Sequence, residues 1–251
     1  MVGHKIRVVH EDNAVLVVDK PSGLVVNRSI TVKGRPTLQD WVEERFAAED
    51  LFGQFDAESD FVRRSGIVHR LDKDTSGLLV LAKTPQAFGK LQAQFKKRLV
   101  KKTYRCLVHD KIREESFVID APLARNPRNR QKFAVVAGGR EARAGFKLEK
   151  IFSKEIEGRL EQFSLLTVFP KTGRTHQIRV HLTAFSHPIV SDPLYNGRKR
   201  LRRDLSWCPR MFLHATQLFF SHPETEEWVR FESKLPEVLE RVLEELENPT
   251  V

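Results

Sequence analysis

The chain has 251 residues, with 43 Lys or Arg against 33 Asp or Glu, so its formal charge at neutral pH is +10. A composition of 40% hydrophobic and 30% charged residues is typical of a globular protein and excludes a disordered one. No apolar run approaches the roughly 20 residues of a membrane span. The first residues lack the apolar core of a signal peptide, and two cysteines indicate free thiols rather than a disulfide framework, so we expect a cytoplasmic protein.

The positive charge gathers at residues 96–105, 125–150 and 171–203, whereas residues 40–60 are acidic. This polarity favours a surface for a polyanion, although composition alone fits an ordinary basic protein equally well. The cysteines and histidines show no metal-ligand spacing, and no Walker or Rossmann loop occurs. We therefore expect neither a metal nor a cofactor.

The first hundred residues predict short strands and two helices. Strands are expected at 6–10 and 15–19, a helix at 37–48, and short buried strands at 66–68 and 78–81. A second helix should begin at Thr84-Pro85, because Thr can cap a helix and Pro suits its first turn.

The rest of the chain is mostly strand-like. The expected elements are strands at 103–109, 116–120, 132–136, 144–152 and 163–169, a helix at 175–185, a hairpin of strands 213–220 and 227–231, and a helix at 236–247. This order predicts an α+β fold with a mixed, mostly antiparallel sheet flanked by helices. No linker divides the chain, so we expect a single domain over residues 1–251.

A polar block, His69–Gly77, lies between the apolar runs 66–68 and 78–81. Asp72 is therefore expected on a loop between buried strands, where reactive groups often lie. The alternative is a turn aspartate that pairs with Arg70 or Lys73, or that accepts backbone hydrogen bonds. Asp74 is interpreted as structural.

Two further segments carry candidate residues. On a helix, His176 and Arg179 would share one face, which could hold a phosphate or pair with a carboxylate, or could be an ordinary charged surface. Tyr104, one of only two tyrosines, lies in an expected strand. An aromatic ring can support an unstacked base, although an isolated strand tyrosine is more often part of the core.

These segments resemble the RluA-type pseudouridine synthases. The block at 69–77 matches the family pattern His-Arg-Leu-Asp-x-x-Thr-Ser-Gly, residues 173–179 match Gly-Arg-Thr-His-Gln-Ile/Leu-Arg, and residues 102–104 match Lys-x-Tyr. Weaker matches are Lys20–Gly23 and Asp192–Gly197, the second with Asn196 inserted. The resemblance covers about 9–231, and a first strand near residue 5 leaves no room for the family's optional S4 domain.

The resemblance implies a catalytic fold with a central RNA-binding cleft and an isomerase that converts uridine to pseudouridine in ribosomal or transfer RNA. The uridine would be flipped into a pocket, and its glycosidic bond would change from N1–C1′ to C5–C1′. By this resemblance Asp72 is the catalytic carboxylate, Tyr104 stacks on the uracil and Arg179 pairs with Asp72. The sequence leaves open whether Asp72 attacks C1′, adds to C6 or removes the 2′ proton.

The expected partner is RNA, not DNA or a membrane, and the protein is expected to act as a monomer. The residues expected to contact RNA are Arg70, His69, Lys73, Thr75, Lys171, Arg174 and His176. The basic run 198–203 is read either as a contact to the RNA backbone or as a solvated loop.

Two other functions compete with this one. A non-catalytic RNA-binding or assembly protein could keep the same fold, but it would have no need for Asp72, Tyr104 and Arg179 together. A hydrolase with Asp72 as nucleophile would need a partner such as His69 or His176.

Overall fold

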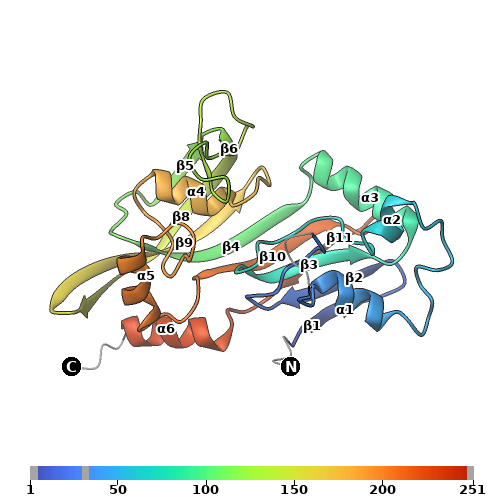
Figure 1. Cartoon of the computed structure of the whole chain (residues 1–251), viewed down its shortest axis with the longest axis horizontal. Helices are drawn as coiled ribbons and strands as arrows, with labels where there is room; N and C mark the ends of the chain where they lie inside the picture. Colours follow the sequence, from blue (N-terminus) through green and yellow to red (C-terminus); the bar gives the residue numbers. More distant parts are fainter. Residues whose placement is uncertain (1–4, 30–33, 248–251) are drawn as a thin grey trace. The chain divides into compact units, whose positions relative to one another are not determined.

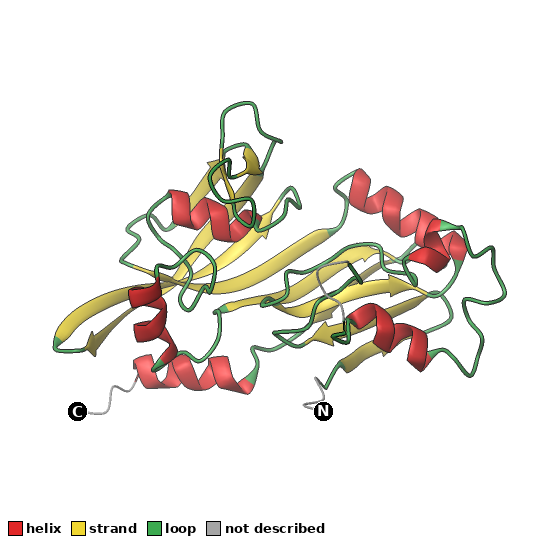
Figure 2. Cartoon of the chain, in the orientation of Figure 1, coloured by secondary structure: helices red, strands yellow, loops and turns green. Residues whose placement is uncertain are grey.

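The computed structural model describes residues 5–29 and 34–247, and it divides into two compact units (Figures 1 and 2). Unit 1 comprises Met1–Lys101 and Gln217–Ser233, and unit 2 comprises Lys102–Thr216 and Lys234–Val251. The single domain expected from the sequence over residues 1–251 stays a prediction.

Unit 1 is built on antiparallel strands. Strand β2 pairs with β1 on one side and with β3 on the other, and β10 pairs with β11. Its elements are β1 (Arg7–Glu11), β2 (Val15–Lys20), α1 (Leu38–Arg45), α2 (Asp60–Arg63), β3 (Ser76–Ala82), α3 (Pro85–Lys96), the end of β10 (Leu213–Ser221) and β11 (Trp228–Glu232).

Strand β3 lies in the hydrophobic core of unit 1. All seven of its residues are buried, so it reads as a continuous apolar run rather than as an alternating one. Helix α3 begins where the sequence predicts it, because the Thr84 side chain accepts the backbone N–H of Ala87 at 3.1 Å and Pro85 occupies the first turn.

Unit 2 has its own antiparallel strands and its own core. Strand β9 pairs with β4 and β8, and β8 pairs with β5. Its elements are β4 (Lys101–His109), β5 (Ser116–Asp120), β6 (Leu123–Arg125), β7 (Phe133–Val135), β8 (Arg143–Ile156), β9 (Arg159–Pro170), α4 (Gln177–Ala184), α5 (Arg198–Leu205) and α6 (Glu237–Glu247). Helix α6 buries Leu239, Val242 and Leu246 against Phe152 and Phe163.

The predicted α+β class with mostly antiparallel pairing is confirmed, and the differences are local. The run 66–68 forms only a single bridge, at Ile67 opposite Leu81, and not a strand. The helix expected from Thr175 begins at Gln177, because His176 has a left-handed backbone (φ 56°). The run 198–203, read as a loop, is helix α5.

Both cysteines, Cys106 and Cys208, are buried free thiols, as expected. Burial raises the pKa of the Cys106 thiol, and it raises that of Cys208 to about 11. Neither thiol is therefore a reactive thiolate at neutral pH. Within residues 5–29 and 34–247, no helix is long and apolar enough to cross a membrane.

Candidate active site

The loop that carries Asp72 alternates between exposed and buried side chains. Leu71 and Thr75 are buried, Asp72 is half-buried, and Arg70 and Lys73 are exposed. The backbone N–H of Thr75 donates to the carbonyl of Asp72 at 3.2 Å, which closes a turn directly before β3. The loop therefore presents Asp72 from a closed turn rather than from a flexible segment.

The segment leading into this loop is fixed to β3. Gly66 has φ +71°, and a Cβ built on it would lie 2.0 Å from the carbonyl oxygen of Ala82, so only glycine fits. The Nε2 atom of His69 accepts the backbone N–H of Val80 at 3.1 Å, and its ring stacks on Phe95 with centroids 4.5 Å apart. His69, expected to contact RNA, thus supports the strand behind the loop.

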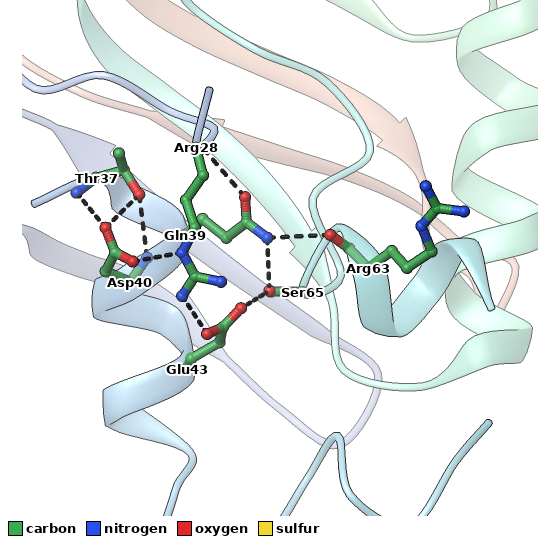
Figure 3. A network of polar contacts seen from close by, with 7 residues as sticks. All are labelled: Arg28, Thr37, Gln39, Asp40, Glu43, Arg63 and Ser65. Atoms are coloured by element: carbon green, nitrogen blue, oxygen red, sulfur yellow. Dashed lines mark hydrogen bonds and ion pairs between the residues drawn. The ribbon is translucent and has the colours of Figure 1, made fainter. Parts of the chain in front are cut away.

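A polar network holds the chain where it turns toward the Asp72 loop (Figure 3). The Gln39 amide donates to the carbonyl of Arg63 at 3.0 Å and to the hydroxyl of Ser65 at 3.2 Å. Ser65 donates to Glu43 at 2.5 Å, and the guanidinium of Arg28 binds Glu43 and, at 2.5 Å, Asp40. The network ties α1 to Arg63, the last residue of α2, and to Ser65, directly before Gly66.

A buried lysine holds the Asp72 loop from the other side. Lys20 is fully buried, and its ammonium donates to the carbonyls of Pro21 at 2.8 Å, Leu24 at 2.8 Å and Lys73 at 3.1 Å. The carbonyl of Lys73 also accepts the N–H of Gly23 at 2.9 Å. The turn at 20–24 and the loop at 72–75 therefore share one cation, which explains why a lysine stands before this turn.

The carbonyl of Asp74 is held in the same way, by the hydroxyl of Ser22 at 2.7 Å. Both residues after Asp72 are thus fixed through their backbone, and the structural role of the Asp74 side chain stays a prediction.

In unit 2, Tyr104 lies in β4, directly opposite Val168 of β9, and is only 9% exposed. Lys102 lies two residues earlier, so it is on the same side of the strand. Its ammonium nitrogen is 3.4 Å from the position of a Cβ on Gly173, in the turn before α4. Burial lowers the pKa of Lys102 from 10.5 to about 8.

Arg179 projects from α4 and forms a buried, two-pronged ion pair with Asp192. Its Nε and Nη2 atoms donate to the two Asp192 oxygens, each at 2.8 Å, and both side chains are at most 3% exposed. Asp192 also accepts the backbone N–H groups of Leu194 and Tyr195, at 2.9 and 3.0 Å. This geometry fixes the plane of the guanidinium.

The ring of Tyr195 lies under the same guanidinium, with its centroid 5.1 Å from Cζ of Arg179. Its hydroxyl lies 3.0 Å from Nδ1 of His176 and accepts the N–H of Phe133 at 3.0 Å. His176 and Arg179 therefore both contact Tyr195, although His176 precedes the helix and the shared helical face expected for the two does not form.

The turn before α4 is locked by Gln177. Its Oε1 accepts the hydroxyl of Thr172 at 2.7 Å and the N–H of Arg174 at 3.0 Å, and its Nε2 donates to the carbonyl of Arg143 at 3.0 Å. The side chain of Arg174 donates to the carbonyl of Glu141 at 2.9 Å. The motif at 173–179 thus builds a rigid platform for Arg179.

The sequence-predicted residues fall into two groups. Tyr104, Lys171, Arg174, His176 and Arg179 belong to unit 2, and Asp72 belongs to unit 1 with His69, Arg70, Lys73 and Thr75. Arg70, Lys73 and Lys171 are exposed, and Thr75 is buried. The catalytic and RNA-binding roles of these residues, and the pairing of Arg179 with Asp72, stay predictions.

A family model described as RNA pseudouridylate synthase matches residues 14–184, which include Asp72, Tyr104 and Arg179. The chain belongs to this family. The family predicted from the three motifs is therefore confirmed. Within residues 5–29 and 34–247, no group of three or more His, Cys, Asp or Glu side chains is arranged to hold a metal ion.

Named relatives of this pseudouridylate synthase chain come from several bacteria. It is 38% identical to the ribosomal large subunit pseudouridine synthase D of Nitrosomonas europaea, over 97% of this chain and 66% of that protein. The protein of the same name from Pseudomonas aeruginosa is 38% identical over 93% of this chain and 69% of its own length. An uncharacterized RNA pseudouridine synthase of Chloroflexus aurantiacus is 41% identical, over 92% and 66%. The chain thus spans about two thirds of the length of these relatives.

Solved structures confirm the fold of this pseudouridylate synthase. Human RNA pseudouridylate synthase domain containing 4 superposes with a TM-score of 0.69 at 23% identity, over 96% of this chain and 92% of that one. Human RNA pseudouridylate synthase domain containing 1 gives 0.67 at 24%, over 98% and 96%.

Sequence reasoning missed two positioning residues in this pseudouridylate synthase. Lys20 belongs to the turn that was noted as a weak family match, but its burial depends on the loop at Lys73, more than fifty positions later, and was not predicted. Asp192 was noted only as part of a weak match, and its pairing with Arg179 depends on how the chain returns after α4. Apart from that weak match, the sequence offered only a carboxylate thirteen residues after an arginine.

Proposed function

We propose that this chain isomerises specific uridines to pseudouridine in structured RNA, with Asp72 as the catalytic carboxylate. The observation that supports this most directly is the Asp72 loop, in which one half-buried carboxylate is presented by a turn whose backbone is fixed by Lys20 and Ser22. Reactive groups need this kind of rigid support.

The chemistry needs no redox partner. The N1–C1′ bond breaks, the uracil turns, C5 bonds to C1′, the C5 proton leaves to solvent and N1 takes up a proton. We propose that Tyr104 stacks on the flipped uracil and that Arg179, with its plane set by Asp192, orients Asp72.

The proposed substrate is ribosomal RNA, with transfer RNA as the second candidate. Ribosomal RNA comes first because two of the relatives are named for the ribosomal large subunit. We further propose that the protein acts as a monomer in the cytoplasm and binds RNA rather than DNA.

The test is tritium release from RNA labelled at C5 of uridine, with transcripts of large-subunit ribosomal RNA and of transfer RNA. Asp72→Asn should reduce release to background and leave RNA affinity within about twofold, because the amide keeps the size of the carboxylate but not its charge. Asp74→Asn is the matched control, two residues away on the same loop, and should stay near wild type. Turnover by the Asp72 variant would remove this residue from the mechanism. If the unmodified protein binds RNA but releases no tritium, a non-catalytic RNA-binding protein would be favoured.

A further inference from the structure

Helix α5 exposes a cluster of positive charge that its own unit does not neutralise. Arg198, Lys199, Arg200 and Arg202 are all exposed. Within residues 5–29 and 34–247, these four side chains form no ion pair, hydrogen bond or ring contact with the protein. The four residues are referred to below as the α5 cations.

The helix beneath them is firmly anchored. Asp204 is buried and accepts from Asn196 at 2.9 Å and from the N–H of Ser191 at 3.0 Å, and it lies 3.0 Å from Nε2 of His109. Arg203 forms an ion pair with Glu161 of β9. The cations are therefore carried by a backbone that is already ordered, so binding would cost little conformational entropy beyond the side chains.

The charge pattern works against the stability of the helix. Arg198 and Arg202 are four residues apart and Lys199 and Arg202 three apart, so like charges are neighbours on the surface. Three cations also occupy the first turn, which has no acidic residue and where the helix dipole disfavours positive charge. Packing does not require these cations, whereas a bound polyanion would relieve their repulsion.

The surface beside α5 is concave and adds a further cation. A cavity of about 430 Å³ is lined by Arg200 and Arg203 of α5 and by Lys111, which follows β4. Asp110 and Glu161 also line it, and Glu161 is already bound to Arg203. Lys111 is exposed and, in the part of the chain that the structure describes, has no ion pair, so the positive surface continues past the helix.

The chemistry of this surface fits a nucleic-acid backbone better than a membrane. Apart from Leu205, the helix exposes no large apolar side chain that could enter a bilayer. Flexible cations on a fixed helix suit phosphates, which position a nucleic acid without reading its sequence.

Its place in unit 2 separates this surface from the candidate active site. Asp204 of α5 contacts His109 at one end of β4, and Tyr104 lies five residues back along the same strand, roughly 17 Å away. A phosphate held by α5 therefore belongs to nucleotides outside the one that reaches Tyr104.

We propose that the α5 cations bind phosphates of the substrate RNA at a point remote from the target uridine. This proposal rests on the proposed function for the identity of the RNA. It predicts that α5 contributes to affinity and to its salt dependence, and that it leaves the chemical step unchanged.

The test compares the wild type with a variant that carries Arg198→Gln, Lys199→Gln, Arg200→Gln and Arg202→Gln. The probe is a fluorescent transcript of large-subunit ribosomal RNA, and Kd is measured between 50 and 300 mM KCl. Each lost phosphate contact should reduce the slope of log Kd against log salt by roughly 0.7–0.9, so two or more contacts give a change of at least about 1.4. Turnover at saturating RNA should stay within twofold.

The matched control replaces Arg198, Arg200 and Arg202 by Lys, which keeps the charge and a similar helix propensity. It should retain the wild-type slope. Thermal unfolding of the Gln variant checks its folding, and its melting temperature should equal or exceed that of the wild type because the repulsion is gone.

Equal slopes for the wild type and the Gln variant would overturn the proposal. So would a loss of binding to polyglutamate without a loss for RNA, since this would point to an acidic protein as the partner. If the slopes of the wild type and the Gln variant differ as predicted but the wild type releases no tritium, the proposed function fails and the role of α5 stands. If the Gln variant keeps both affinity and turnover, the proposed function stands and the role of α5 fails.

Discussion

The loop of Asp72 and the platform of Arg179 are positioned by different means. In unit 1, the residues around Asp72 are held through their backbone, by the ammonium of Lys20 and the hydroxyl of Ser22. In unit 2, Arg179 is held through its side chain, by a buried ion pair with Asp192 and the ring of Tyr195.

The difference shows what each residue must do. The contacts to the carbonyls of Lys73 and Asp74 fix the loop of Asp72 through its backbone. A side-chain pair orients the guanidinium of Arg179 but leaves a buried charge behind if either partner is removed. Mutations should therefore affect unit 2 mainly through charge and unit 1 mainly through loop order.

The largest effect is expected for Asp192→Ala. It leaves Arg179 buried without its partner, which typically destabilises a protein by about 3–5 kcal/mol. It also removes the acceptor of two backbone N–H groups. Urea unfolding should show a lower midpoint, and Glu244→Ala, at an exposed carboxylate of the same unit, should change it little. An unchanged midpoint for the Asp192 variant would contradict the importance of the pair.

Lys20→Met should destabilise the protein by about 2 kcal/mol, because three carbonyls lose a charged donor in a buried site. The loop of Asp72 should loosen, so turnover should fall more than RNA affinity. Measurement of kcat and Kd for the same RNA separates these effects, and Lys5→Met, at an exposed lysine of unit 1, is the control. Wild-type turnover in the Lys20 variant would show that this contact does not order the loop.

Lys102 gives a prediction for alkaline pH. Burial lowers its pKa from 10.5 to about 8, so between these values the unfolded chain binds more protons and stability should rise with pH. The penalty for the buried ammonium is full below pH 8 and disappears above 10.5. Lys102→Met should therefore be more stable than the wild type at pH 7, and the gain should shrink as the pH rises toward 10.5. Urea unfolding at pH 7, 9 and 10.5 tests this, and a gain that does not depend on pH would exclude burial of charge as its cause.

The smallest effect concerns Asp12, in the turn between β1 and β2. Burial raises its pKa, but hydrogen bonds from His10, Val15 and Ala14 outweigh this and lower the pKa from 3.8 to about 2. The ionised form therefore adds stability above pH 3.8 that is lost as the pH falls toward 2. Because this carboxylate is 32% exposed, Asp12→Asn should cost only about 1 kcal/mol at pH 6. Thermal unfolding from pH 2 to 6 should show a shallower acid slope for the variant, and identical slopes would remove Asp12 from the acid response.

Local patterns predicted much of unit 1 and of the candidate site. The cap at Thr84 and the buried run of β3 depend on neighbours in sequence, so they could be recognised directly. The single bridge at Ile67 could not, because it results from the close approach of Gly66 to Ala82.

The elements that were missed depend on distant contacts. The charged run of α5 is short and contains only two apolar residues, Leu201 and Leu205, so little in the local sequence distinguished a helix from a loop. Its anchor is Asp204, which contacts His109 in a strand 95 residues earlier. The sequence did not predict the partner of Arg179 for the same reason, since the ion pair between Arg179 and Asp192 forms only when the chain folds back after α4.

The two buried thiols make the protein convenient for site-specific labelling. Cys106 and Cys208 should react slowly with maleimides in the folded state, so they need not be replaced first. A Leu205→Cys substitution on α5, at a position 45% exposed, would then supply the one readily accessible attachment point for a dye. Its emission could report RNA arriving at this helix in real time.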